Sequence, residues 1–573
     1  MDNKEIASIF NQIAELLEIK QDNPFKIRAY QRAARNLESL SVDLTDVYRS
    51  GGLKALQEIP GIGHDLSLKI EEYLKTGKIA SQKALAREFP KGILELINIP
   101  GMGPKTAQLL YKKLGIDSLN KLKMAAQAGK LQHLPGMGEK KEANILRGIG
   151  FKEASHGRFL LDDATVHAAM IVEELEKLKE AKKILPCGSL RRGQETVGDL
   201  DILVISDKPK PIMDKFVSLK LVKSVLAHGE TKSAIVMHNG MQADLRVVPA
   251  KSFGAAAHYF TGSKGHNIHI RQLAQKKGWK VSEYGIFDAK GRQIGGQTEE
   301  EMFSKFGLQY IPPELREMRG EFTAAAAGKI PRLIELGDIR GDLHMHTTAT
   351  DGENSLEEMA KAAKHLAYEY ILITDHTQST RVAHGLDAGK SSANLHKIKL
   401  AAKNISGIRL LAGAEIDILP DGSLDLPGEI IKQLDLAVLA VHSNFKMPRE
   451  QMTARIIKAM QRLPGSILAH PTGRLLGERE AYAVDLNAVI KAAAKYRCIL
   501  EVNAHPKRLD LTDFYCRAAK AAGVKIAIST DAHATDQLGL MKYGVITARR
   551  GWLEKQDVVN TWPLAKLQRV CGF

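Results

Sequence analysis

Acidic side chains two residues apart offer the clearest chemistry in this chain of 573 residues. Asp199 and Asp201 stand at the start of the apolar run 202–205, which predicts a strand. Successive side chains of a strand alternate between its faces, so both carboxylates point the same way. Asp244, in the second predicted strand 243–248, offers a third carboxylate. Such a group predicts a site for two Mg²⁺ or Mn²⁺ ions, which would stabilise the attacking and leaving oxygens of a phosphoryl transfer.

The surrounding residues resemble the nucleotidyltransferase palm of the family X DNA polymerases. The resemblance rests on the segments 188–193 (Gly-Ser-Leu-Arg-Arg-Gly) and 259–263 (Tyr-Phe-Thr-Gly-Ser). It implies that Asp199 and Asp201 hold both metals and that Asp244 holds the metal that activates the primer 3′-hydroxyl. It further implies that dNTPs are bound by Gly188, Ser189, Arg192, Tyr259, Phe260, Gly262, Ser263, Asn267 and Arg271. In this set Ser189 and Arg192 would hold the triphosphate, and the aromatic pair would gate the sugar.

A Pro-Gly-x-Gly motif begins at Pro60, Pro100 and Pro135, each time within helical patterning. Proline ends one helix, the glycines permit a tight turn, and the N–H groups that open the next helix can bind a phosphate. This predicts helix-hairpin-helix units that grip the DNA backbone without reading its sequence. A P-loop and a dinucleotide fingerprint do not fit these motifs. The predicted DNA-binding glycines are Gly61, Gly63, Gly101, Gly103, Gly136 and Gly138.

The first of these units is similar to the lyase domain of family X. The resemblance implies that Lys69 forms a Schiff base with an abasic sugar, supported by Lys26 and Tyr30. Asp65 stands where some relatives carry a second lysine. The alternative is that Lys69 only binds phosphate.

Histidine becomes prominent after the small-residue stretch 324–331. His344 and His346 are two residues apart on a predicted strand, and further histidines and acids stand singly where apolar runs end. Strands separated by helices, with polar residues at their carboxyl ends, predict an α/β barrel with a site at one mouth. Imidazole combined with carboxylate favours Zn²⁺ or Mn²⁺.

This pattern resembles the PHP (polymerase and histidinol phosphatase) domain, a family of metal-dependent phosphoesterases with a distorted barrel. The resemblance implies three metal ions. It fills all nine ligand positions of the family, with His344, His346, Asp351, His376, Glu415, His442, His470, Asp531 and His533.

The net charge of +16 indicates an anionic partner such as nucleic acid. Residues 338–573 hold 31 Lys and Arg against 26 Asp and Glu, which leaves 51 against 40, or +11, for residues 1–337. No apolar run is long enough to cross a bilayer. The start of the chain lacks a signal-peptide pattern, and the four cysteines have no paired spacing, so we expect reduced thiols and a cytoplasmic protein. We also expect a monomer.

The order of motifs resembles the bacterial type of family X DNA polymerase. The fold class expected is multidomain: helical helix-hairpin-helix domains, an α+β palm with a thumb, and an α/β distorted barrel. The expected bounds are 1–88 (lyase-like), 89–152 (fingers-like), 153–250 (palm), 251–322 (thumb-like), 323–337 (linker) and 338–573 (PHP).

The resemblance implies a DNA-directed DNA polymerase that fills short gaps in gapped or nicked duplex DNA during base excision repair. The PHP site would act as a 3′–5′ exonuclease, with abasic-site cleavage or 3′-phosphate removal as variants. Two alternatives stay open: a DNA-end-binding scaffold with a structural PHP domain, and a template-independent nucleotidyltransferase that acts on RNA.

Overall fold

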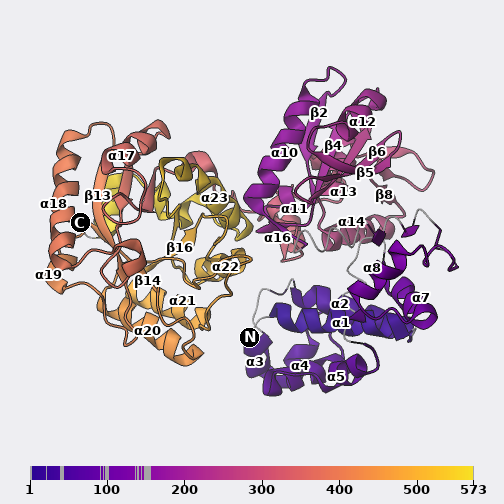
Figure 1. Ribbon diagram of the computed structural model, residues 1–573, viewed down its shortest axis with the longest axis horizontal. Helices are drawn as coiled ribbons and strands as arrows, with labels where there is room; N and C mark the ends of the chain where they lie inside the picture. The colour runs from indigo at the N-terminus through magenta and orange to yellow at the C-terminus, as the bar shows by residue number, and fades with distance from the viewer. Residues whose placement is uncertain are drawn as a thin grey trace.

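The chain forms a helical amino-terminal part, a part built on a mixed sheet, and a barrel (Figure 1). The fold class predicted from the sequence is therefore confirmed. The computed structural model describes residues 3–20, 22–38, 40, 44–90, 92–93, 96, 102–135, 137–138, 141–142, 145–146 and 157–571. No helix in these ranges is both long and apolar enough to cross a membrane.

The amino-terminal part is a cluster of amphipathic helices around one apolar core. Its helices are α1 (Asn3–Lys20), α2 (Pro24–Glu38), α3 (Leu44–Gln57), α4 (His64–Thr76), α5 (Ala80–Arg87), α7 (Pro104–Leu114) and α8 (Leu119–Gln127). Helices α4 and α7 begin directly after Gly63 and Gly103, which occupy their N-cap positions. The open space around both glycines leaves these helix starts accessible. The predicted DNA-binding residues Gly101 and Gly136 lie outside the described residues.

The central part is a five-stranded sheet in the order β2-β4-β7-β6-β5, in which only β4 and β7 run parallel to each other. Its elements are β1 (Phe159–Leu160), α10 (Leu161–Glu176), β2 (Lys183–Pro186), α11 (Gly188–Arg191), β3 (Thr196–Val197), β4 (Asp199–Ile205), α12 (Pro209–Val217), β5 (Val222–His228), β6 (Lys232–Met237) and β7 (Gln242–Val248). The parallel pairing matters because it brings the amino-terminal ends of β4 and β7, which carry the aspartates, to the same edge.

A smaller unit follows, with its own apolar core and a three-stranded antiparallel sheet. Its elements are α13 (Phe253–Thr261), α14 (Lys264–Lys276), β8 (Lys280–Ser282), β9 (Gly285–Phe287), β10 (Gln293–Gly295), α15 (Glu299–Ser304) and α16 (Glu321–Ala326). Helix α14 begins at Ser263, whose hydroxyl accepts a hydrogen bond from the His266 N–H at 3.4 Å.

The barrel consists of seven parallel strands that follow one another in sequence order, β11 to β17. A parallel bridge between Met345 and Ala532 joins the first strand to the last. The strands are β11 (Gly341–Met345), β12 (Tyr370–Ile373), β13 (Arg409–Asp417), β14 (Leu436–Ala440), β15 (Ile467–Leu468), β16 (Ile499–Asn503) and β17 (Ile526–Ser529). The helices are α17 (Leu356–His365), α18 (Ala388–Asn404), α19 (Gly428–Ile431), α20 (Arg449–Arg462), α21 (Leu486–Tyr496), α22 (Asp513–Ala521), α23 (Met541–Arg550) and α24 (Leu564–Cys571).

Strand β12 shows how the barrel core forms. All four of its residues are buried, as expected for a strand covered on both faces. Tyr370 and Leu372 belong to one core cluster, and Ile371 and Ile373 to the other. This alternation places one apolar layer inside the barrel and a second between the barrel and its helices.

The barrel is docked on the rest of the chain through α23. The Arg550 side chain donates to the Arg192 carbonyl at 2.6 Å and contacts Glu317 at 3.2 Å and Asp513 at 2.7 Å. A side chain at Gly193 would meet Ile546 of α23 at 2.1 Å.

Residues of the predicted linker 323–337 pack against the units on both sides. Ala325 is buried in the core of the smaller unit, and Ile334 is buried in the barrel core. The domain bounds themselves stay a prediction.

We expect Arg550→Met to lower the free energy of unfolding by about 3–5 kcal/mol, because it removes one partner from a buried ion cluster. The Arg550 side chain is only 5% exposed, and its loss leaves Glu317 and Asp513 with one cation fewer. The matched control is Arg292→Met, since the Arg292 side chain is 73% exposed and pairs with Asp288 on the surface. Denaturant unfolding of both variants tests this. Equal stability of the two variants would contradict it.

Candidate metal centres

The three predicted carboxylates of the central sheet come together at one edge. Asp201 on β4 and Asp244 on β7 are register neighbours in the parallel pair, and Asp199 precedes Asp201 by two residues on the same face. Burial, and then the charges of Asp199 and Asp244, raises the pKa of Asp201 to about 7. Burial and Asp244 also raise the pKa of Asp199. A divalent cation would relieve this repulsion, so the carboxylates fit the predicted metal site.

Gly188 allows the backbone to approach these carboxylates closely. Its φ is +62°, and a Cβ atom there would lie 2.4 Å from Asp201 Oδ2. Any larger residue would displace the carboxylate. The Cys187 N–H also donates to the Asp201 carbonyl at 2.7 Å, which fixes the start of α11 beside β4.

Asp199 and Asp201 line a pocket of about 760 Å³. Its lining contains Gly188, Ser189, Arg192, Asp199, Asp201, Tyr259, Phe260, Gly262, Asn267 and Arg271 from the predicted set, and also Arg158, Gln194, Gly198, Thr261 and Lys264. Ser263 instead caps α14. The sequence resemblance did not single out Arg158 or Lys264, because neither belongs to the two segments that carry it. The roles of all these residues stay predictions.

The pocket wall is held in place by hydrogen bonds. Arg192 donates to the Glu317 carboxylate at 2.9 Å and to the Thr261 carbonyl at 2.6 Å. The Asn267 amide donates to the Tyr259 carbonyl at 2.7 Å. The rings of Tyr259 and Phe260 meet edge to face, with centroids 5.2 Å apart. Arg192 is thus positioned by both the smaller unit and, through Glu317 and Arg550, the barrel.

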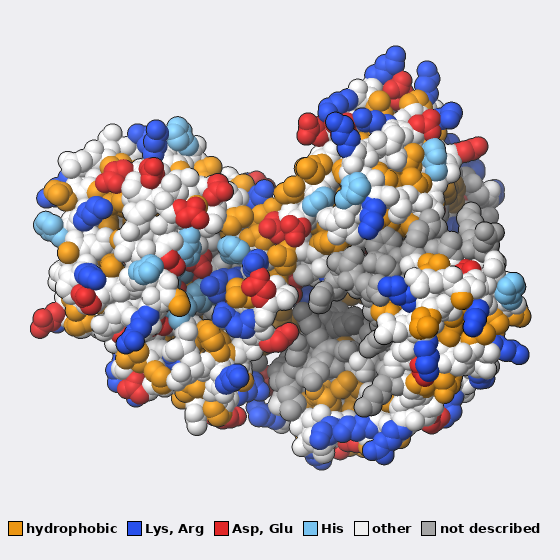
Figure 2. Space-filling model, in the orientation of Figure 1, with side chains coloured by type: hydrophobic (Ala, Val, Ile, Leu, Met, Phe, Trp, Pro, Cys, Tyr) orange, Lys and Arg blue, Asp and Glu red, His pale blue; other side chains and the backbone are white. Residues whose placement is uncertain are grey.

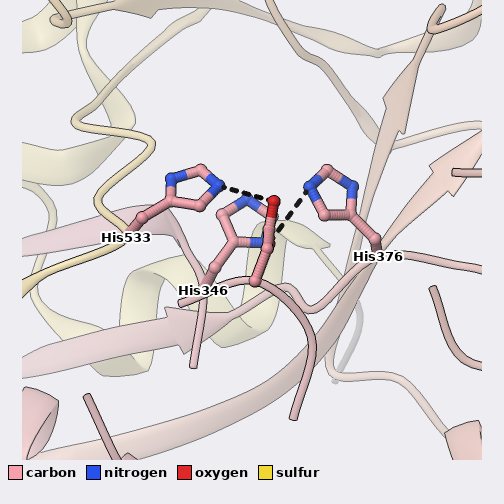
Figure 3. A group of neighbouring side chains, drawn as sticks. His346, His376 and His533 are labelled. Atoms are coloured by element: carbon pink, nitrogen blue, oxygen red, sulfur yellow. Dashed lines mark ion pairs between the residues drawn. The ribbon is translucent and has the colours of Figure 1, made fainter. Parts of the chain in front are cut away.

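At the mouth of the barrel, the predicted ligands gather at the carboxyl ends of the strands. Three groups of them have ligand atoms close enough to share an ion: His346, Asp351, His376 and His533; His344, His346 and Asp531; and His376, Glu415 and His442. Figure 3 shows the rings of His346, His376 and His533 turned toward one another. The ninth predicted ligand, His470, places its Nε2 atom 3.0 Å from Glu415.

Glu415 is the centre of this cluster. It is 1% exposed, and one or the other of its oxygens lies 2.9 to 3.6 Å from nitrogens of five histidines, namely His344, His346, His376, His442 and His470. Burial alone would raise its pKa, but the imidazoles of His442, His376 and His344 hold the pKa of Glu415 well below its usual range. The carboxylate is therefore ionised and ready to bind a cation.

Two of the imidazoles, those of His346 and His442, have pKa values shifted in opposite directions. Burial, followed by the charges of His376 and His533, lowers the pKa of His346 to about 3, so this ring is neutral as a metal ligand must be. The pKa of His442 is raised to about 10 by Glu415 and Asp417 against the effect of burial. A proton on His442 would stand where a metal ion binds, so ion binding there releases that proton.

An orphaned buried atom supports a metal in this cluster. Within the part of the chain that the structure describes, His346 Nδ1 is buried and has no hydrogen-bond partner. Buried polar atoms normally have one, because leaving one unpaired is costly. A divalent ion would satisfy such atoms, and the imidazole and carboxylate donors suit Zn²⁺ or Mn²⁺.

Two carboxylates behind the ligands were missed by sequence reasoning. Glu501 accepts from His344 Nδ1 at 2.8 Å and from the His470 N–H at 2.7 Å, and Asp417 lies 3.2 Å from His442 Nδ1. Such partners fix the tautomer and orientation of metal-binding histidines. The available signal was an acid inside an apolar strand, since Glu501 interrupts the run Ile499–Val502 in β16.

The predicted lyase residues lie on two helices, Lys26 and Tyr30 on α2 and Asp65 and Lys69 on α4. Tyr30 is buried, and burial together with Asp65 raises its pKa to about 12. Lys26 lies 3.7 Å from Asp22. Among the described residues, no hydrogen bond or ion pair to Lys69 is recorded. Its role stays a prediction.

Comparison with known protein families divides the chain as the geometry does. Family models match a helix-hairpin-helix domain at residues 1–79 and a SAM-like helix-hairpin-helix tandem at 93–150. The DNA polymerase beta palm matches 161–262, the DNA polymerase beta thumb matches 256–317, and the PHP domain matches 342–505.

Individual relatives cover either the whole chain or one half. The DNA polymerase/3′-5′ exonuclease PolX of Bacillus subtilis is 38% identical over 571 residues, 99% of each chain. DNA polymerase lambda of Rattus norvegicus is 28% identical over 45% of this chain and 48% of its own. A probable phosphatase of Thermoanaerobacter sp. is 28% identical over 38% of this chain and 89% of its own.

We expect Glu501→Gln to weaken metal binding at the barrel by about 10- to 100-fold, the usual effect of losing a partner that orients a ligand. The change keeps the size of the side chain but removes the charge behind His344. Calorimetric titration of metal-free protein with Zn²⁺ measures the affinity. Glu369→Gln is the control, because the Glu369 side chain is 44% exposed and pairs with Arg340 on the surface. Unchanged affinity in Glu501→Gln would refute the assignment.

Proposed function

Because this chain belongs to the family X DNA polymerases that carry a carboxy-terminal PHP domain, we propose that it extends DNA 3′ ends at the palm and shortens them at the PHP site. The observation that supports the proposal is that the candidate ligands fall into two distinct sets, three carboxylates on β4 and β7 and the histidine-rich groups at the barrel mouth. The palm, thumb and PHP domain are the regions that the family models match.

The palm residues have distinct tasks in nucleotide addition. Asp199, Asp201 and Asp244 would hold Mg²⁺ or Mn²⁺, which supplies charge stabilisation to the attacking and leaving oxygens. Ser189 and Arg192 line the pocket beside these carboxylates and would bind the triphosphate of a dNTP. The rigid edge-to-face pair Tyr259 and Phe260 would close on the deoxyribose and leave no room for a 2′-hydroxyl. This wall disfavours the alternative of ribonucleotide addition.

The PHP residues would cut phosphodiesters at DNA 3′ ends. Three ions of Mn²⁺ or Zn²⁺ held by the nine ligands would supply a metal-activated water and charge stabilisation. The name of the full-length relative includes a 3′-5′ exonuclease, which favours this reaction. The Thermoanaerobacter relative is named a probable phosphatase, so removal of a 3′-phosphate is the variant that a comparison supports. A purely structural PHP domain is disfavoured, because it would have no need of a complete ligand set.

The natural substrate in this proposal is gapped or nicked duplex DNA, as in base excision repair. Gly63 and Gly103 open two helices whose first N–H groups can bind backbone phosphates. The excess of +11 in residues 1–337 provides sequence-independent attraction.

The two activities should fail separately. Asp201→Asn removes a metal-binding charge, so nucleotide addition should fall by more than about 100-fold, since even outer partners of ligands contribute 10- to 100-fold. Shortening of 3′ ends should persist. His346→Ala deletes a ligand shared by two of the barrel groups and should have the opposite effect.

One gapped duplex with a labelled primer, incubated with each variant, with and without dNTPs, reports both reactions. Melting curves establish that the variants are folded. The two-site assignment is wrong if Asp201→Asn stops digestion or if folded His346→Ala digests normally.

The pKa of about 7 at Asp201 predicts a pH dependence. Below pH 7 a metal ion must displace a proton from Asp201. The apparent dissociation constant of Mg²⁺ in nucleotide addition should therefore fall about fivefold from pH 6 to pH 7 and change little above pH 8. In metal-free protein the folded state binds the Asp201 proton more tightly than the unfolded state does. This carboxyl therefore contributes stability below about pH 4 that is lost as the pH rises through about 7. Extension rates at graded Mg²⁺, in the His346→Ala background to suppress digestion, test this. A constant independent of pH would contradict it.

A further inference from the structure

An aromatic ring and a guanidinium lie face to face near the PHP metal ligands. The Arg479 guanidinium carbon is 4.4 Å from the centre of the Phe445 ring, and Phe445 follows the ligand His442 by three residues. The Tyr482 ring is nearly parallel to that of Phe445, at 10° and 6.1 Å between centroids. Neither Phe445 nor Arg479 is fully buried. We call this pair, Phe445 and Arg479, the stacking pair.

The stacking pair is tied to a second metal ligand through the backbone. Gly473 donates from its N–H to the His470 carbonyl at 2.9 Å, and Arg479 donates to the Gly473 carbonyl at 2.9 Å. Tyr482 donates its hydroxyl to the Pro471 carbonyl at 2.8 Å. Gly473 has a φ of +59°, and a Cβ there would lie 2.6 Å from the Tyr482 ring. This loop therefore fixes Arg479 relative to His470.

The loop that carries Phe445 is also fixed. Arg455, which is 2% exposed, donates to the Ser443 carbonyl at 2.8 Å. A buried cation thus holds the segment between His442 and Phe445. Hydrogen bonds therefore hold the segments that carry the stacking pair in place before a ligand binds, which reduces the entropic cost of binding a ligand there.

A second arginine contacts one of the metal ligands directly. Arg508 Nε is 3.4 Å from the Asp531 carboxylate. Burial, followed by the charge of Arg508, lowers the pKa of Arg479. Figure 2 shows blue Lys and Arg side chains beside pale blue histidines on the barrel face turned toward the rest of the chain. Two arginines beside a metal cluster suit a phosphate that approaches the ions.

The depth of the ligands limits what can reach them. His344 and His346 are fully buried, and Asp531 is 6% exposed. A phosphodiester must enter the barrel mouth to approach these groups. A base that leaves the stack of its neighbours on this path needs a new partner.

We propose that Phe445 and Arg479 form a nucleobase subsite, on which the base of a nucleotide flanking the scissile phosphodiester stacks, while Arg508 contacts its phosphate. The ligand is the 3′-terminal segment of a single DNA strand, so the inference rests on the 3′-5′ exonuclease function proposed above. Stacking on aromatic and guanidinium planes is tolerant of sequence, because every base has a π-face. The subsite would thus hold frayed ends of any sequence.

The test uses the full-length protein and a 5′-labelled single-stranded oligonucleotide with Mn²⁺. Phe445→Leu should raise KM about 10- to 100-fold, the range that follows from losing one stacked base, with kcat nearly unchanged. Arg479→Lys keeps the charge but loses the plane and should show a similar increase. For wild type, KM should rise by the same factor on an oligonucleotide that lacks the base at the terminal or the penultimate nucleotide. On that oligonucleotide Phe445→Leu should raise KM no further.

The control is Tyr496→Leu. Tyr496 also lies under a cation, Lys495 at 5.1 Å, but it precedes β16 and so lies at the opposite end of the barrel. Nucleotide addition by every variant reports that the protein is folded. If wild type shortens no oligonucleotide, the exonuclease proposal itself fails. If wild type digests but base removal and Phe445→Leu leave KM unchanged, or their effects simply multiply, the subsite is refuted.

Discussion

The Glu415 carboxylate sets the main constraint on this molecule. It is buried with five imidazoles around it at the mouth of the barrel. Without a cation, only protons on the surrounding imidazoles can balance the charge of Glu415. Among the described residues, His346 Nδ1 then stays without a hydrogen-bond partner. Burial of ionisable groups at this density is costly unless they coordinate metal. The barrel strands, Glu501 and Asp417 all serve to keep these ligands in place.

The palm obeys the same rule with fewer groups. Burial, followed by the charges of Asp199 and Asp244 on the two parallel strands, raises the pKa of Asp201 to about 7. Gly188 has no side chain because the backbone must pass beside Asp201. The palm pocket is also joined to the barrel, since Arg550 contacts the carbonyl of Arg192 and the Glu317 carboxylate that positions it. The two sites share no proposed ligand, yet they stand on one packed framework.

Much of this arrangement was predictable, because short-range spacing determines it. Two aspartates at a spacing of two on a strand must share a face, and histidines at the ends of parallel strands must meet at one mouth. The sequence did not reveal contacts between distant segments. Glu501 stands out as an acid inside an apolar strand, but it lies 157 residues from His344, and no local feature shows that this histidine is its partner. Likewise, the small residues of the predicted linker 323–337 do not show that Ala325 and Ile334 would be buried in two different cores. Phe445 and Arg479 are likewise unremarkable until the fold stacks them.

Anomalous diffraction from crystals grown with Mn²⁺ and a nonhydrolysable dNTP tests the central claim that this chain builds two separate metal centres. The account predicts peaks between Asp199, Asp201 and Asp244 and, independently, peaks in the groups around His346, Glu415 and Asp531. Crystals in which Mn²⁺ binds elsewhere while either set of ligands stays without a peak would contradict it.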